Sequence, residues 1–189
     1  MKKWLVGSLV GAAFLFFWQF ISWGVSGLHD GEYKHHPQQE QIISSLSGFI
    51  KEDGQYMIPR EAPGATNAER EAAMQQMIGK PWAVVNYKAS HEHNMTMSMI
   101  RGFLVDLVIV LLLISVLGKR TDLSMGSVWM GSLAIGFIGY LWNPYTQHIW
   151  FQTPDAVITG ALIDWLVAYS ILGLWLGFWL KRVSTNNRP

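Results

Sequence analysis

The chain has 189 residues, of which 50% are hydrophobic and 14% are charged, and it contains no cysteine. So low a charge content argues against intrinsic disorder, and the lack of cysteine excludes disulfides, thiolate-bound zinc, iron–sulfur clusters and cysteine nucleophiles. A net charge of +1 gives no reason to expect nucleic acid as a partner.

Four long apolar stretches are expected to cross a membrane. About 20 mainly apolar residues are enough to span a hydrocarbon core of about 30 Å. The alternative, buried helices of a soluble protein, leaves too little polar surface for a chain of this length. The sequence therefore predicts an all-α membrane bundle of four transmembrane helices. Their expected bounds are Trp4–Ser26, Met99–Gly118, Ser124–Trp142 and Ala156–Leu180.

Lysine and arginine residues are distributed unevenly around these spans. Apart from Arg101 and six in the long segment 27–98, they occur before the first span, between the second and third, and after the fourth, in residues 1–3, 119–123 and 181–189. The connection 143–155 on the opposite side has none. The positive-inside rule then places both termini in the cytoplasm. We interpret residues 1–26 as the N-terminus with an uncleaved signal anchor, in preference to a cleaved signal peptide, because the apolar run is longer than a normal signal core.

Residues 27–98 are polar, rich in turn residues, and predicted to form a small extracytoplasmic α+β domain between the first two spans. Helical spacing of apolar residues indicates a helix over Gln38–Ile50. The pattern Thr66-x-x-Glu69 is a capping box that opens a second helix ending near Ile78. Two short strands are expected at Gly54–Pro59 and Trp82–Tyr87. The remaining segments are 99–180, holding the last three spans, and a cytoplasmic tail at 181–189.

The charged residues inside the spans are the most specific functional signal. Asp106 and Asp164 are predicted to lie about 10 and 12 Å below the outer ends of their helices, and Gln19 lies at a similar depth. A charged carboxylate at the bilayer centre costs roughly 2.5–3.5 kcal/mol, so such groups usually face a bundle interior and a partner. One interpretation is a proton or cation site between the two aspartates. The equally supported alternative is that both are packing residues or contact another subunit, with Arg101, one turn above Asp106, as a further neutralising group.

A second candidate site is a run of histidine and methionine residues just outside the second span. Imidazole and thioether ligands suit copper, particularly Cu(I). Solvent-exposed histidine and interfacial methionine explain the same pattern, and we favour that explanation. The sequence thus predicts no cofactor, and copper is the one metal for which it offers ligands. These ligands would be His91, His93, Met95, Met97 and Met99, which His29, His35, His36 and His148 would be free to join.

Two pairs of glycines have the spacing that lets helices approach closely in lipid: Gly7 with Gly11, and Gly173 with Gly177. Packing within one four-helix chain is the favoured explanation, and formation of a homo-oligomer is the alternative.

The overall plan resembles a loose group of bacterial four-span inner-membrane proteins with no known activity. The motifs that carry the resemblance are the Lys-Lys start, Gly7-x-x-x-Gly11, Trp18–Trp23, Gly54–Pro59, Gly79–Ala83 and Met99–Phe103. The resemblance implies a multi-pass protein of the bacterial inner membrane whose outside domain is periplasmic.

The sequence contains no phosphate-binding loop, nucleophile elbow or zinc-protease motif, so we expect no enzyme. The favoured expectation is a non-catalytic accessory or assembly component of an envelope complex, in contact with lipid and with other membrane or periplasmic proteins. The alternative is a small proton- or cation-coupled transport module using Asp106 and Asp164. The third is periplasmic copper handling.

Overall fold

A computed structural model describes residues 2–119 and 123–185 of the chain. The structure is mostly helical, with four helices long and apolar enough to cross a membrane and one small two-stranded sheet. It divides into a helical unit, which runs up to Lys34 and resumes at Asn94, and a second unit, His35–His93.

Helix bounds in the helical unit agree with the predicted spans to within a few residues, apart from two extensions. The second long helix begins four residues earlier than expected, because the Asn94 side chain accepts a hydrogen bond from the Met97 amide (3.0 Å) and caps the helix there. The fourth continues five residues beyond the predicted Leu180. The helices are α1 (Lys2–Gly24), α4 (Met95–Leu117), α5 (Met125–Tyr140) and α7 (Asp155–Thr185).

The connection expected over residues 143–155 is mostly helical instead. α5 continues through a π-helical turn, η1 (Leu141–Tyr145), into α6 (Thr146–Phe151). Pro144 lies inside the turn, and a proline has no N–H to donate to the helix, so the widened turn accommodates it. The chain then reverses into α7 after Gln152, whose φ of 48° is left-handed.

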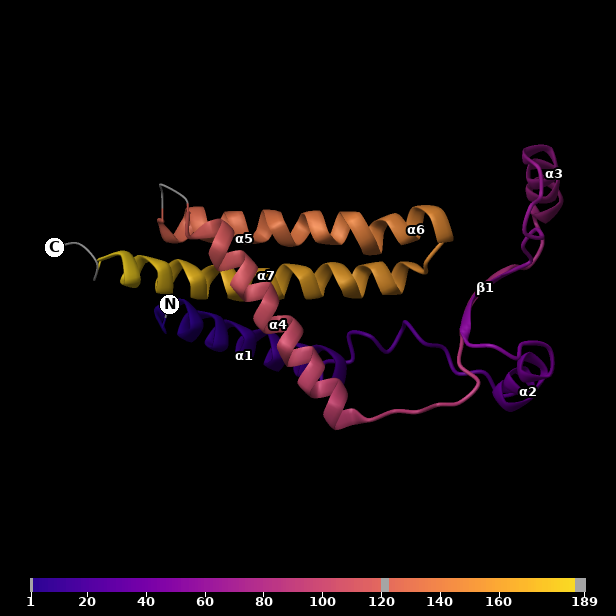
Figure 1. The fold of residues 1–189 in the computed structure, drawn as a ribbon, viewed down its shortest axis with the longest axis horizontal. Coiled ribbons are helices and arrows are strands. Elements are labelled where there is room, and N and C mark those ends of the chain that lie inside the picture. Colours follow the sequence, from indigo (N-terminus) through magenta and orange to yellow (C-terminus); the bar gives the residue numbers. More distant parts are fainter. Residues whose placement is uncertain (1, 120–122, 186–189) are drawn as a thin grey trace. The chain divides into compact units, whose positions relative to one another are not determined.

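The helices of this unit pack in the order α5, α7, α1, α4, with α7 contacting both α5 and α1 and α1 contacting α4. Figure 1 shows α1, α5 and α7 running along one direction and α4 crossing them obliquely. Their shared core is aliphatic and lies toward the C-terminal ends of α4 and α7. It is formed by Leu15, Val110, Leu113, Ile114, Leu117, Val128, Leu172, Leu176 and Leu180.

The two glycine pairs of the sequence lie at contacts between helices of the same chain. A Cβ atom at Gly173 on α7 would lie 2.8 Å from the Cα atom of Trp129 on α5, closer than real side chains pack. Gly177 faces α5 in the same way, and the side chains facing Gly7 and Gly11 come from α7 and α4. Gly173 and Gly177 therefore let the backbones of α7 and α5 approach each other closely, whereas Gly7 and Gly11 leave room for side chains of α7 and α4.

The second unit, His35–His93, consists of α2 (Gln39–Phe49), β1 (Gly54–Ile58), α3 (Asn67–Met77) and β2 (Ala83–Tyr87). β1 and β2 pair antiparallel, from Gly54 opposite Tyr87 to Ile58 opposite Ala83. The predicted capping box is present at the start of α3. Neither helix has a buried residue, so this unit has very little core of its own.

Candidate functional site

Residues 27–34, which the sequence assigned to the outside domain, belong to the helical unit. α1 ends where the amides of Val25 and Ser26 both donate to the Ile21 carbonyl (3.1 and 2.8 Å). Gly27 then takes a left-handed conformation (φ 69°), which favours glycine. Two successive turns follow, closed by the Asp30 amide on the Gly27 carbonyl and by the Glu32 amide on the His29 carbonyl. This compact reversal brings His29 back over the last turns of α1.

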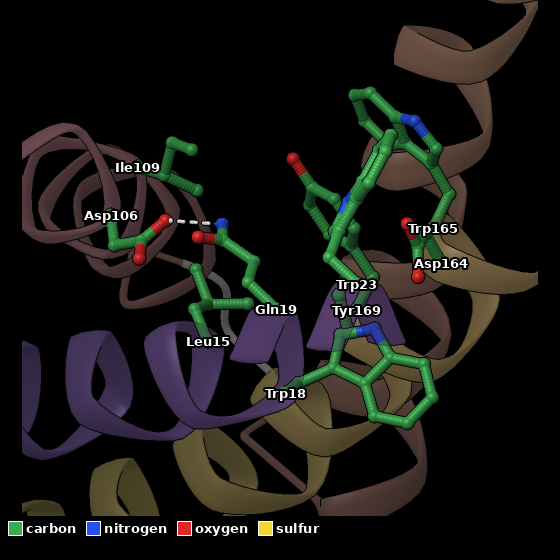
Figure 2. A pocket seen from close by; sticks show the side chains of 10 residues that line it. Leu15, Trp18, Gln19, Trp23, Asp106, Ile109, Asp164, Trp165 and Tyr169 are labelled. Atoms are coloured by element: carbon green, nitrogen blue, oxygen red, sulfur yellow. Dashed lines mark hydrogen bonds between the residues drawn. The ribbon is translucent and has the colours of Figure 1, made fainter. Parts of the chain in front are cut away.

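A cavity of about 270 Å³ lies among α1, α4 and α7. Its lining includes the carboxyl groups of Asp106 and Asp164, and the described residues around it include no lysine or arginine. Figure 2 shows the two aspartates on opposite sides of the cavity, with Gln19 between them. The other walls are aromatic and aliphatic, formed by Trp18, Trp23, Trp165, Tyr169, Leu15, Ile109 and Ala168.

Asp106 is almost completely buried, with 1% of its surface exposed. Gln19 Nε2 donates a hydrogen bond to Asp106 Oδ1 (2.9 Å), as Figure 2 shows. Within the described residues, Asp106 Oδ2 has no hydrogen-bond partner, and neither does the buried Trp18 Nε1. A buried polar atom without a partner costs about 1–3 kcal/mol, so both are exceptional groups in a protein interior.

Asp164 is held by two groups at the outer end of α1. Ser22 Oγ donates to Asp164 Oδ1 (2.5 Å), and His29 Nε2 lies 3.1 Å from Asp164 Oδ2 and 2.9 Å from Ser22 Oγ. Ser22 comes one turn after Gln19 on α1, so one helix supplies a hydrogen bond to each aspartate.

His29 joins Asp164 to a third carboxyl group. Its Nδ1 atom lies 2.5 Å from Glu32 Oε1, and the side chains of His29 and Glu32 are only 6% and 5% exposed. Trp23 covers the imidazole, with ring centroids 3.7 Å apart and planes 3° from parallel. Gly160, one turn before Asp164 on α7, leaves the space for this pair, because a Cβ there would lie 2.6 Å from Glu32 Oε1.

The hydrogen bonds restrict the proton positions in this chain of groups. If Ser22 donates its single hydroxyl proton to an ionised Asp164, His29 Nε2 carries a proton that it donates to Ser22 or Asp164. The Nδ1 contact then has two solutions. Either His29 is an imidazolium between two carboxylates, or it is neutral and accepts a proton from Glu32. In both states Glu32, His29 and Asp164 together carry a net charge of −1, and the states differ only in the position of one proton.

Asp106 and Asp164 thus share a cavity, while each has its own hydrogen-bond donors. Arg101 is exposed, and among the described residues it forms no ion pair with either aspartate. The arrangement contains a carboxyl–imidazole–carboxyl chain at one end and an isolated carboxyl group across the cavity. Such an arrangement is able to bind and pass protons or to bind a cation.

The residues of the copper prediction lie elsewhere in the chain. The rings of His91 and His93 stack with centroids 5.9 Å apart, and Met95, Met97 and Met99 are exposed in the first turns of α4. Within the described residues, no group of three or more histidine, aspartate or glutamate side chains is placed to hold a metal ion. His148 instead hydrogen-bonds the Thr153 carbonyl oxygen (2.7 Å).

Sequence reasoning missed the roles of Ser22 and Glu32, and it placed His29 only among optional copper ligands. The available signal was the spacing His29-x-x-Glu32 directly after a span whose last turns contain Gln19 and Ser22. That signal is weak, because the contact with Asp164 depends on a fold that joins positions 135 residues apart.

Comparison of the chain with models of known protein families, with curated proteins and with solved structures finds no match.

Proposed function

We propose that the chain is a multi-pass protein of the bacterial inner membrane, with both termini in the cytoplasm, and that it is a small proton-linked transport module. The observation that carries this proposal is that two aspartates within apolar spans line one cavity, and one of them continues into the Glu32–His29 pair. Intramembrane carboxyl groups in such settings form proton relays and ion sites. The geometry therefore favours transport over the purely accessory role expected from the sequence.

The proton path in this proposal begins at the outer end of the helices. A proton shared by Glu32 and His29 passes through the imidazole to Asp164, because accepting a proton at Nδ1 allows release of the one at Nε2. The cavity separates Asp164 from Asp106. Beyond Asp106 on α4 lie Val110, Leu113 and Ile114 of the aliphatic core, which close the inner half of the bundle. Release to the inner side therefore requires a rearrangement of the helices, so the proton path is gated and is not an open channel.

Proteoliposomes provide the test. With potassium and a pH-sensitive dye inside, valinomycin sets the lumen negative and drives protons inward. The intact protein should acidify the lumen faster than empty liposomes, and the Asp106→Asn/Asp164→Asn variant should not. Asp155→Asn is the matched control, because Asp155 lies on α7 with a 90% exposed side chain. Equal acidification by the intact protein and the double variant would overturn the proposal.

The accessory role remains a second candidate because α2 and α3 carry apolar side chains that this unit does not cover. Phe49 at the end of α2 and Ile78 directly after α3 are 88% and 73% exposed, and Ile43 on α2 is 53% exposed. Exposed apolar surface of this kind marks sites of contact with proteins or lipid. Purification in a gentle detergent should recover a defined partner, and Ile43→Ser/Phe49→Ser should lose it. Recovery of the same partner by this variant would argue against docking through α2.

A further inference from the structure

The geometry points to a substrate class for the cavity: we infer that it binds a small organic amine in its protonated form. This inference rests on the proposed role of Asp106 and Asp164 as the binding site. Three properties of the cavity support it, namely its charge, its unpaired acceptor and its aromatic walls.

The charge of the site favours a cation. Asp106 and Asp164 line the cavity, and no lysine or arginine among the described residues does so. The nearest titratable groups behind Asp164 are His29 and Glu32, whose pair carries no net charge in either of its proton arrangements. An anionic ligand would therefore meet uncompensated carboxylates, whereas a ligand of charge +1 would neutralise one of them.

One carboxylate oxygen of a lining residue lacks a hydrogen-bond donor among the described residues. Asp106 is 1% exposed and its Oδ2 atom has no partner within the described part of the chain, whereas both oxygens of Asp164 already face Ser22 or His29. An ammonium N–H group would supply the missing donor in a charge-assisted hydrogen bond. Hard metal cations take six or more oxygen ligands, and this lining offers far fewer beside its aromatic and aliphatic groups.

The walls favour an organic cation over a hydrated inorganic one. Four aromatic side chains line the cavity: Trp18, Trp23, Trp165 and Tyr169. Aromatic faces attract cations, most strongly where the contact is shielded from water. A volume of about 270 Å³ lies just below the range of roughly 300–1,000 Å³ that drug-sized ligands occupy, so the ligand is small.

Phenethylamine and 2-phenylethanol form a suitable pair of probes, because they share a phenylethyl group and only the amine is cationic near neutral pH. The full chain in lipid nanodiscs is titrated with each by calorimetry, and tryptophan fluorescence reports occupancy of the cavity. We expect the amine to bind at least tenfold more tightly than the alcohol. Equal binding of the two probes would overturn the inference, because it would make the cavity a general apolar pocket.

Variants locate the binding. Asp106→Asn keeps the shape of the side chain and should weaken amine binding at least tenfold, and Trp18→Leu, which removes an aromatic wall, should weaken it several-fold. Asp155→Asn should bind like the intact protein. Size-exclusion profiles and circular dichroism show whether each variant is folded, and the comparison of the two probes on the intact protein needs no variant. Unchanged amine binding by a folded Asp106→Asn protein contradicts the inference.

The two proposals fail separately. Aspartate-dependent proton movement without amine binding would overturn the amine site and leave the transport role standing. Amine binding that depends on Asp106, in a protein without proton movement, would support the site and contradict the proton-linked role.

Discussion

Replacing His29 by phenylalanine is the most informative test of the carboxyl–imidazole chain. The change keeps a ring that stacks on Trp23 and removes both ring nitrogens, which lie 2.5 Å from Glu32 and 3.1 Å from Asp164. If the pair is ionic, removing one partner costs about 3–5 kcal/mol, because the remaining charge is left uncompensated; if it is neutral, the unmade hydrogen bond costs about 1–3 kcal/mol. Glu32 is affected most, because its side chain is 5% exposed.

A loss of about 3 kcal/mol corresponds to a fall in Tm of roughly 6–12 °C for a chain of this size. Tryptophan fluorescence during heating of the detergent-purified protein measures it. His35→Phe is the control, since His35 is exposed and should change stability by less than about 0.5 kcal/mol. A His29→Phe protein that unfolds within about 2 °C of the intact chain would refute the buried chain of groups.

A second variant checks the reason for the loss. Adding Glu32→Gln to His29→Phe removes the unpaired charge, and an uncharged amide costs less to bury than a carboxylate. The double variant should therefore be more stable than His29→Phe alone, with a coupling between the sites of about 0.5–3 kcal/mol. Additive losses would show that Glu32 and His29 do not interact.

Three further changes test other parts of the structure. Gly173→Ala should destabilise the helical unit by about 1–3 kcal/mol through overpacking against α5. Gly126→Ala is the control and should be neutral in thermal unfolding, because nothing lies within 4 Å of the new methyl group. Equal effects of the two changes would contradict the close contact at Gly173. The hydrogen bond from Lys88 holds the pKa of Asp53 below its usual 3.8, so this carboxylate contributes stability above that pH and the contribution is lost as pH falls through the lowered value. Lys88→Met should raise the midpoint seen by carboxyl NMR, and an unchanged midpoint would rule out the pairing. Thr66→Ala should lower the stability of α3 by about 1 kcal/mol and reduce hydrogen-exchange protection in its first turn. Unaltered protection there would show that the cap is not needed.

The sequence alone was sufficient for most of the secondary structure. Hydropathy and length located all four long helices, because crossing a membrane requires about 20 apolar residues and few soluble elements share that pattern. The capping box at Thr66 and Glu69 and the two strands were also recognisable, since caps and short apolar runs are local signals. The helical path through Pro144 was missed because a proline normally ends a helix, and a π-turn that tolerates it has no clear signature.

The tertiary structure decided how the polar residues are combined. The sequence identified Asp106 and Asp164 as unusual, because charge within an apolar span is visible residue by residue. It did not indicate that Gln19 and Ser22 serve different aspartates, or that His29 and Glu32 fold back beside Gly160. Those contacts depend on which faces of α1, α4 and α7 meet. Helix pairing in lipid is set by close packing between residues far apart in the chain, and hydropathy does not predict which faces pack together.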